Sequence, residues 1–117
     1  MDVQGFSEWL ESRSTADRIK ALSLIYVSMT IRSRQFFLPE MVGKEKRVIE
    51  VLHGINEVHH TIANCLVGYA TGDQKHTFPP QVLSQQLAEI ESQYGIEGFL
   101  SPTIDSVRGS ARFREAR

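Results

Sequence analysis

Two Glu-x-x-His pairs stand seven residues apart within the stretch 44–70: Glu50 with His53, and Glu57 with His60. Residues separated by three, four or seven positions share one face of an α-helix, so all four side chains would point the same way. Carboxylate oxygens and imidazole nitrogens are ligands that zinc and iron accept in proteins. The spacing therefore makes Glu50, His53, Glu57 and His60 candidate metal ligands.

A solvated helix face has the same pattern, and it is the simpler interpretation. Di-iron bundles draw Glu-x-x-His pairs from two helices and single glutamates from two more, all pointing inward. Here both pairs lie on one predicted helix, on the side away from its apolar residues. A divalent metal would therefore need a second copy of this helix from a partner subunit, and no cofactor is expected otherwise.

A second candidate site consists of cations near the end of the predicted helix 14–37 and at the start of the stretch 44–70. Guanidinium groups and the free amides of a helix N-terminus both bind phosphate or carboxylate, so the cluster predicts an anion site. Pairing with nearby glutamates, or plain solvation, is the alternative. No aromatic residues are interleaved for base stacking, which argues against single-stranded nucleic acid. The cluster comprises Arg32, Arg34, Lys44, Lys46 and Arg47.

Five residues separate Arg47 from His53, and this spacing resembles the Arg-and-His pattern of small helical ribonucleases of the HEPN class. Those proteins are also similar in size and helical content, and the resemblance implies RNA cleavage by these two residues. At about 100° per residue, however, Arg47 and His53 lie about 120° apart around the helix axis. They would not point at one phosphate.

No other catalytic arrangement is visible. The chain has no Gly-x-Ser-x-Gly, no phosphate-cradling glycine loop and no Cys-x-x-Cys. The single cysteine, Cys65, is expected to be a buried small hydrophobe, and His59 a core histidine with satisfied hydrogen bonds. Catalysis therefore has no positive support in the sequence.

The stretch 44–70 is predicted to form the longest helix, with Gly72 at its left-handed C-terminal cap. Its length of about 40 Å requires the other helices to pack along it. Small residues recur on one flank, at Gly54, Thr61 and Gly68, and would let the second helix or a partner subunit approach closely. The predicted buried stripe is Val48, Val51, Leu52, Ile55, Val58, Ile62, Leu66 and Tyr69.

Four further helices are predicted around it, together with a tail that lacks helical periodicity. Ser14 and Asp17 form a capping box at the start of the second helix, and Gly95 followed by Ile96 predicts a Schellman ending for the fourth. The basic tail, 109–117, is expected to be unstructured, apart from a possible anchor at Phe113. The expected helices span residues 6–11, 14–37, 80–94 and 102–108.

Composition restricts the class of protein. Apolar residues make up 41% and charged residues 23% of 117 residues, as in ordinary globular domains, so a single domain over 1–117 is expected. The net charge of −1 argues against nucleic-acid binding as the main task. No stretch reaches the about 20 apolar residues of a membrane span, and the first residues do not resemble a signal peptide. A cytoplasmic protein is expected.

The predicted fold is all-α: a small bundle of three main helices with short terminal helices. The second helix is apolar on several sides, more than its predicted neighbours cover, so we expect a homodimer to complete the bundle. The function expected from this is protein–protein interaction, as an adaptor, a regulator, or an immunity-type or chaperone-type protein. A metal-binding bundle and a HEPN-like ribonuclease are the alternatives.

Overall fold

The computed structural model describes residues 3–36, 42–73, 78–110 and 113, and in these residues every regular element is helical. The helices are α1 (Val3–Glu11), α2 (Thr15–Phe36), α3 (Glu45–Thr71), α4 (Pro80–Tyr94) and α5 (Leu100–Arg108). The all-α prediction is confirmed. With 27 residues α3 is the longest helix, while α1 and α5 have nine each, so three main helices and two short ones is a fair approximation.

Local signals placed most helix ends correctly. The amide of Asp17 donates to Ser14 Oγ at 3.2 Å, which satisfies one free N–H at the start of α2. Gly72 and Gly95 both adopt the left-handed conformation directly after α3 and α4. The amide of Ile96 donates back to the Glu91 carbonyl at 3.0 Å, as a Schellman ending requires, and Ile96 is fully buried.

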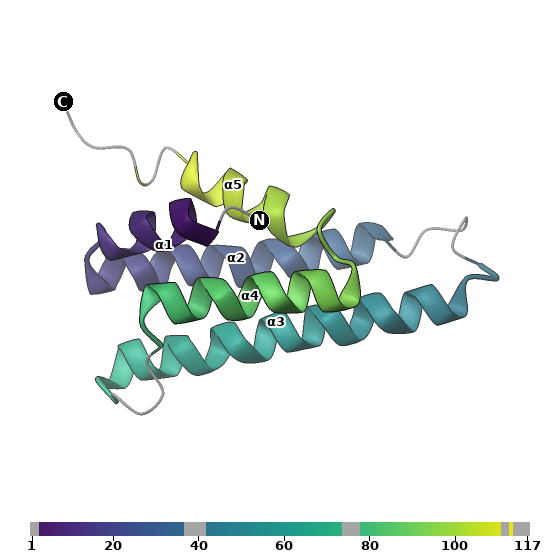
Figure 1. The fold of residues 1–117 in the computed structure, drawn as a ribbon, viewed down its shortest axis with the longest axis horizontal. Coiled ribbons are helices and arrows are strands. Elements are labelled where there is room, and N and C mark those ends of the chain that lie inside the picture. Colours follow the sequence, from purple (N-terminus) through teal and green to yellow (C-terminus); the bar gives the residue numbers. More distant parts are fainter. Residues whose placement is uncertain (1–2, 37–41, 74–77, 111–112, 114–117) are drawn as a thin grey trace.

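Figure 1 shows α2 and α3 as two long antiparallel helices side by side, with α4 lying along α3 and α5 beside α2. In addition, α1 packs on α4, and Arg18 of α2 holds the end of α1 by donating to the carbonyl of Leu10 at 2.8 Å. One hydrophobic core draws residues from all five helices. Its largest members are Phe6, Leu10, Leu22, Ile25, Met29, Ile62, Leu83, Leu87, Ile96, Leu100 and Ile104.

The buried face of α3 is rotated from the predicted stripe. Val51, Ile55, Val58 and Ile62 are buried as expected, but Leu52 is 39% exposed. The prediction that Leu52 lies in the core is therefore wrong. The reason is that α4 covers the flank with the small residues, so Gly54, Thr61, Cys65 and Gly68 are buried there and the opposite edge of the stripe turns to solvent.

Gly54 marks the closest approach between α3 and α4. A Cβ atom built on Gly54 would lie 2.7 Å from Cβ of Tyr94, inside any normal contact distance. The sequence indicated a close approach here but favoured the second helix or a partner as the neighbour. The neighbour is α4, and glycine is required because the backbone of α3 and the side-chain base of Tyr94 share the same space.

The short helices begin earlier than predicted. In α1, which starts at Val3, Phe6 and Leu10 are fully buried, so this helix is part of the core. In α5, which starts at Leu100, Ser101 donates its hydroxyl to the carboxylate of Glu91. Glu91 belongs to α4 and is 2% exposed.

Phe113 anchors the C-terminal tail. It is buried, its ring meets that of Trp9 edge to face at 5.2 Å, and its carbonyl accepts a hydrogen bond from Arg13 Nη1 at 3.0 Å. The tail was predicted to be unstructured apart from an anchor at Phe113, and the burial of this aromatic ring against α1 agrees with that exception. Residues 111–112 and 114–117 of the tail lie outside the described residues.

Among the described residues, none of the helices combines the length and the apolar content that crossing a membrane requires.

Candidate functional site

The Glu/His face of α3 is open to solvent. Glu50, His53, Glu57 and His60 are all exposed. His60 Nε2 lies 3.3 Å from the side-chain amide of Asn64, one turn further along the helix. In the part of the chain that the structure describes, no three His, Cys, Asp or Glu side chains gather closely enough to hold a metal ion.

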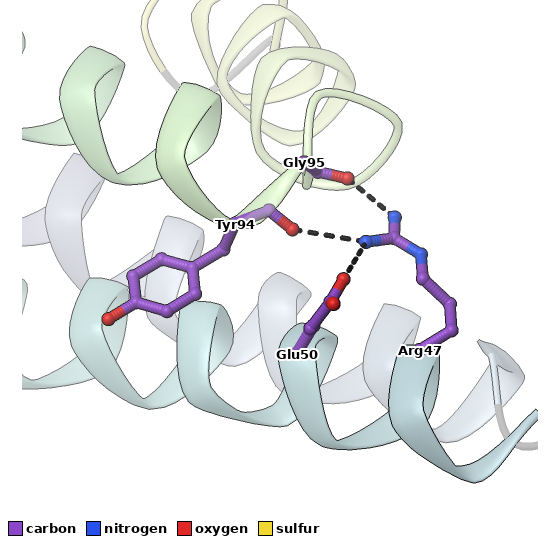
Figure 2. A network of polar contacts seen from close by, with 4 residues as sticks. All are labelled: Arg47, Glu50, Tyr94 and Gly95. Atoms are coloured by element: carbon purple, nitrogen blue, oxygen red, sulfur yellow. Dashed lines mark hydrogen bonds and ion pairs between the residues drawn. The ribbon is translucent and has the colours of Figure 1, made fainter.

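Arg47 is occupied with the end of a neighbouring helix. Its Nη1 donates to the carbonyl of Tyr94 at 3.1 Å and its Nη2 donates to that of Gly95 at 2.6 Å, while Nη1 also lies 3.6 Å from Glu50 Oε2 (Figure 2). The last carbonyls of a helix have no partner within the helix, and they carry the negative end of its dipole. Arg47 thus caps the C-terminus of α4 from the neighbouring helix α3. Its guanidinium points at the α4 carbonyls and not at the predicted anion site.

The other predicted anion-binding cations lie in different surroundings. Arg34, Lys44 and Lys46 are exposed, and Lys44 stands immediately before α3. Arg32 is half-buried and lines a shallow groove with Ser28 of α2 and Ser106 of α5. The expected cluster is therefore distributed over the α4 terminus, the α2–α5 groove and the solvated start of α3.

His59 lies half-buried between α2 and α3, with its ring nitrogen hydrogen-bonded as predicted, although it is not part of the fully buried core. Its ring stacks on that of Tyr26 with centroids 4.1 Å apart, and Nε2 lies 3.1 Å from the carbonyl of Tyr26. Since a carbonyl only accepts, Nε2 carries the proton and donates. Thr30 Oγ1 lies 3.3 Å from the same nitrogen. Burial lowers the pKa of His59 below its ordinary value, and the hydrogen bond to Tyr26 opposes this only in part.

This lowered pKa predicts a loss of stability in mild acid. In the unfolded chain the pKa of His59 lies near its ordinary value of 6.5, so below that pH the unfolded state binds a proton that the folded state resists. The free energy of unfolding should therefore fall as the pH drops through this value, until the folded-state pKa is passed. Urea denaturation at several pH values between neutral and mildly acidic measures this slope. His59→Gln, which keeps an N–H donor, should flatten it, and His53→Gln controls for the removal of an imidazole elsewhere.

Cys65 is fully buried on α3 and has no sign of activation. Burial raises the pKa of its thiol, and this outweighs the opposing effects of the Phe78 carbonyl, Tyr69 and Arg18. A protonated, buried thiol is a poor nucleophile and a poor metal ligand. The expectation that Cys65 is a buried small hydrophobe is confirmed.

The most distinctive surface feature is an apolar groove between α2 and α3, hereafter the α2–α3 groove. It is an open depression of ≈ 350 Å³ on the side of the α2–α3 pair where Val27 and Val67 are exposed. Val27 is 54% exposed and Val67 56%, and Ile31, one turn beyond Val27, is 51% exposed. The lining residues are Ser23, Tyr26, Val27, Ala63, Leu66 and Val67.

Sequence reasoning anticipated only half of this groove. It predicted that α2 has more apolar surface than its neighbours cover, and the exposure of Val27 and Ile31 agrees with that. It did not identify Val67. This residue was not part of the predicted buried stripe of α3, and nothing in the sequence showed that it lies beside α2. The available signal was that Ala63 and Val67 stand four residues apart, as do Ser23 and Val27, so each pair forms one outward ridge.

Comparison of the chain with protein-family models, curated proteins and solved structures found no match to any of the three.

Proposed function

We propose that this chain is a small protein–protein interaction module that acts as a homodimer through the α2–α3 groove. The observation that supports this proposal is the exposure of Val27 and Val67, which line one apolar groove between α2 and α3. Solvated apolar side chains gathered in one place are typical of surfaces that bind a partner.

A second copy of the chain is the partner that fits this surface most simply. Two antiparallel helices with an apolar outer seam form half of a four-helix bundle, and a second identical pair completes it. Such a dimer would still present other surfaces to further partners, which suits an adaptor, a regulator, or an immunity-type or chaperone-type protein. The exposed Glu/His face of α3 remains the alternative, as a metal site formed between subunits.

Native mass spectrometry of untagged protein, purified without chelator, tests both the dimer and the metal. The parent protein should have the mass of a dimer. Val27→Glu should dissociate it, with a dimer Kd raised at least about tenfold, because two-fold symmetry places two unpaired carboxylates in an apolar contact. Val82→Glu is the matched control: this valine is also exposed, at 39%, but it lies on α4.

Two results would contradict the proposal. A parent protein that stays monomeric at high concentration has no self-association through any face. A dimer that tolerates Val27→Glu but dissociates with Val82→Glu uses α4 instead of the α2–α3 groove. A stoichiometric zinc or iron adduct in the same spectrum would favour the Glu/His face as the site.

A further inference from the structure

We infer that in the homodimer α2 of one copy packs against α3 of the other, with the two-fold axis parallel to the helices. This inference rests on the proposed function, and it adds the arrangement of the partner. Its basis is a charge difference between the two helices that form the groove.

The two helices carry charges of opposite sign. Beyond Asp17, α2 has no acidic residue, whereas Arg18, Lys20, Arg32 and Arg34 supply positive charge. Beyond Arg47, α3 has no lysine or arginine, and its acidic residues are Glu50 and Glu57. Lys20, Arg34, Glu50 and Glu57 are all exposed. The groove therefore separates a basic helix from an acidic one.

Two face-to-face arrangements keep the helices nearly parallel and obey two-fold symmetry. In one, the axis is perpendicular to the helices, so α2 meets α2 in antiparallel fashion. Lys20 and Arg34 each stand seven residues from Val27, on the same ridge. An axis centred at Val27 would then place Lys20 of each copy opposite Arg34 of the other, and like charges directly opposed are unfavourable.

In the other arrangement, the axis is parallel to the helices and α2 meets α3. Rotation about this axis leaves every residue at the same height along the bundle. Residues of α2 and α3 that are level within one copy are therefore also level across the contact between the two copies. His59 of α3 contacts Tyr26 and Thr30 of α2, which places it level with the middle of the turn 26–30. Arg34 lies about six residues beyond that point, so on the antiparallel helix it is level with the segment between Glu50 and Glu57.

Arg34 is therefore within about one helical turn, in height, of both glutamates. Arg34 lies on the outward ridge of α2, and Glu50 and Glu57 are exposed on α3. Packing α2 on α3 brings Arg34 of one copy beside this acidic segment of the other, and symmetry repeats the contact. Charge thus favours this arrangement over the one that opposes Lys20 to Arg34.

Cross-linking between variants that each have one added cysteine distinguishes the two arrangements. We would mix Val27→Cys with Val67→Cys and treat the mixture with a short bismaleimide; the natural Cys65 is buried and serves as the background. Mixing separate variants avoids a link within one chain, because both positions line the same groove. We expect a covalent dimer in the mixture and none with Val27→Cys alone.

The possible results separate this inference from the proposed function. A covalent dimer with Val27→Cys alone would show that α2 meets α2, which overturns the arrangement and leaves the homodimer intact. A dimeric protein that forms neither cross-link would also overturn the arrangement. A monomeric parent in native mass spectrometry would overturn the homodimer itself, and the arrangement with it.

A charge exchange supplies an independent readout. Arg34→Glu and Glu57→Arg should each raise the dimer Kd by about threefold to tenfold, and the double variant should return it close to the parent value. Lys46→Glu reverses the charge of an exposed side chain at the start of α3 and is the control for the change in net charge. If the double variant is weaker than both single variants, Arg34 does not face Glu57.

Discussion

Replacing Ile62 by alanine is expected to lower the free energy of unfolding by about 2–5 kcal/mol. Ile62 is fully buried at the centre of α3 and belongs to the core that joins all five helices. Removing three carbon atoms there forfeits their burial and leaves a cavity that close-packed neighbours fill only in part. Urea denaturation followed by circular dichroism measures the change, and the m-value should stay constant if both proteins unfold in two states.

Leu52→Ala is the comparison that makes this experiment informative about the orientation of α3. Seen from the sequence, Leu52 belongs to the same apolar stripe as Ile62, and alanine should then cost about as much at both positions. In the structure Leu52 is 39% exposed, so alanine should cost less than about 1 kcal/mol. Equal losses at the two positions would show that α3 is rotated relative to the structure described above.

Gly54→Val is expected to destabilise the protein by about 3 kcal/mol, the upper end of what overpacking usually costs. The first atom of any side chain at Gly54 would lie 2.7 Å from Cβ of Tyr94. That atom is fixed to the backbone of α4 and cannot swing aside, so the two helices would have to separate. The loss should appear in urea denaturation as a lower midpoint.

Gly98→Val is the matched control, because a Cβ atom at Gly98 would meet no atom within 4 Å. It should change stability by no more than about 0.5 kcal/mol. Gly54→Ala then tests the sign of the effect. In an open helix alanine would stabilise α3 by about 1 kcal/mol relative to glycine. A gain in stability with Gly54→Ala would therefore contradict the close approach of α4.

The elements themselves follow largely from local sequence. Ser14 caps the start of α2 because its hydroxyl accepts a hydrogen bond from the free amide of Asp17. Gly72 and Gly95 end α3 and α4 because glycine adopts the left-handed conformation without strain. These interactions span only a few residues, so the printed sequence shows both partners. The start of α5 was misplaced because a serine before Pro102 resembles an N-terminal cap. In the structure the hydroxyl of Ser101 instead donates a hydrogen bond to the carboxylate of Glu91 in α4.

The face that each helix buries is less accessible from sequence when apolar and small residues cover more than one side of it. On α3 the apolar stripe and the small-residue flank compete for the core, and the position of α4 decides between them. This is why Ile55 was placed correctly and Leu52 was not. The same limit applies to Arg47, whose spacing to His53 suggested chemistry but whose partners are the Tyr94 and Gly95 carbonyls.

The sequence by itself determined that this protein is all-helical, where most of its helices begin and end, and that α2 has more apolar surface than a small bundle covers. Only the tertiary structure decided that Val27 and Val67 line one groove, that Gly54 faces Tyr94, and that Arg47 caps α4. Caps and periodicity act within one or two turns and are visible in adjacent residues. A groove between two helices depends on their relative rotation, which is set by the packing of the whole core.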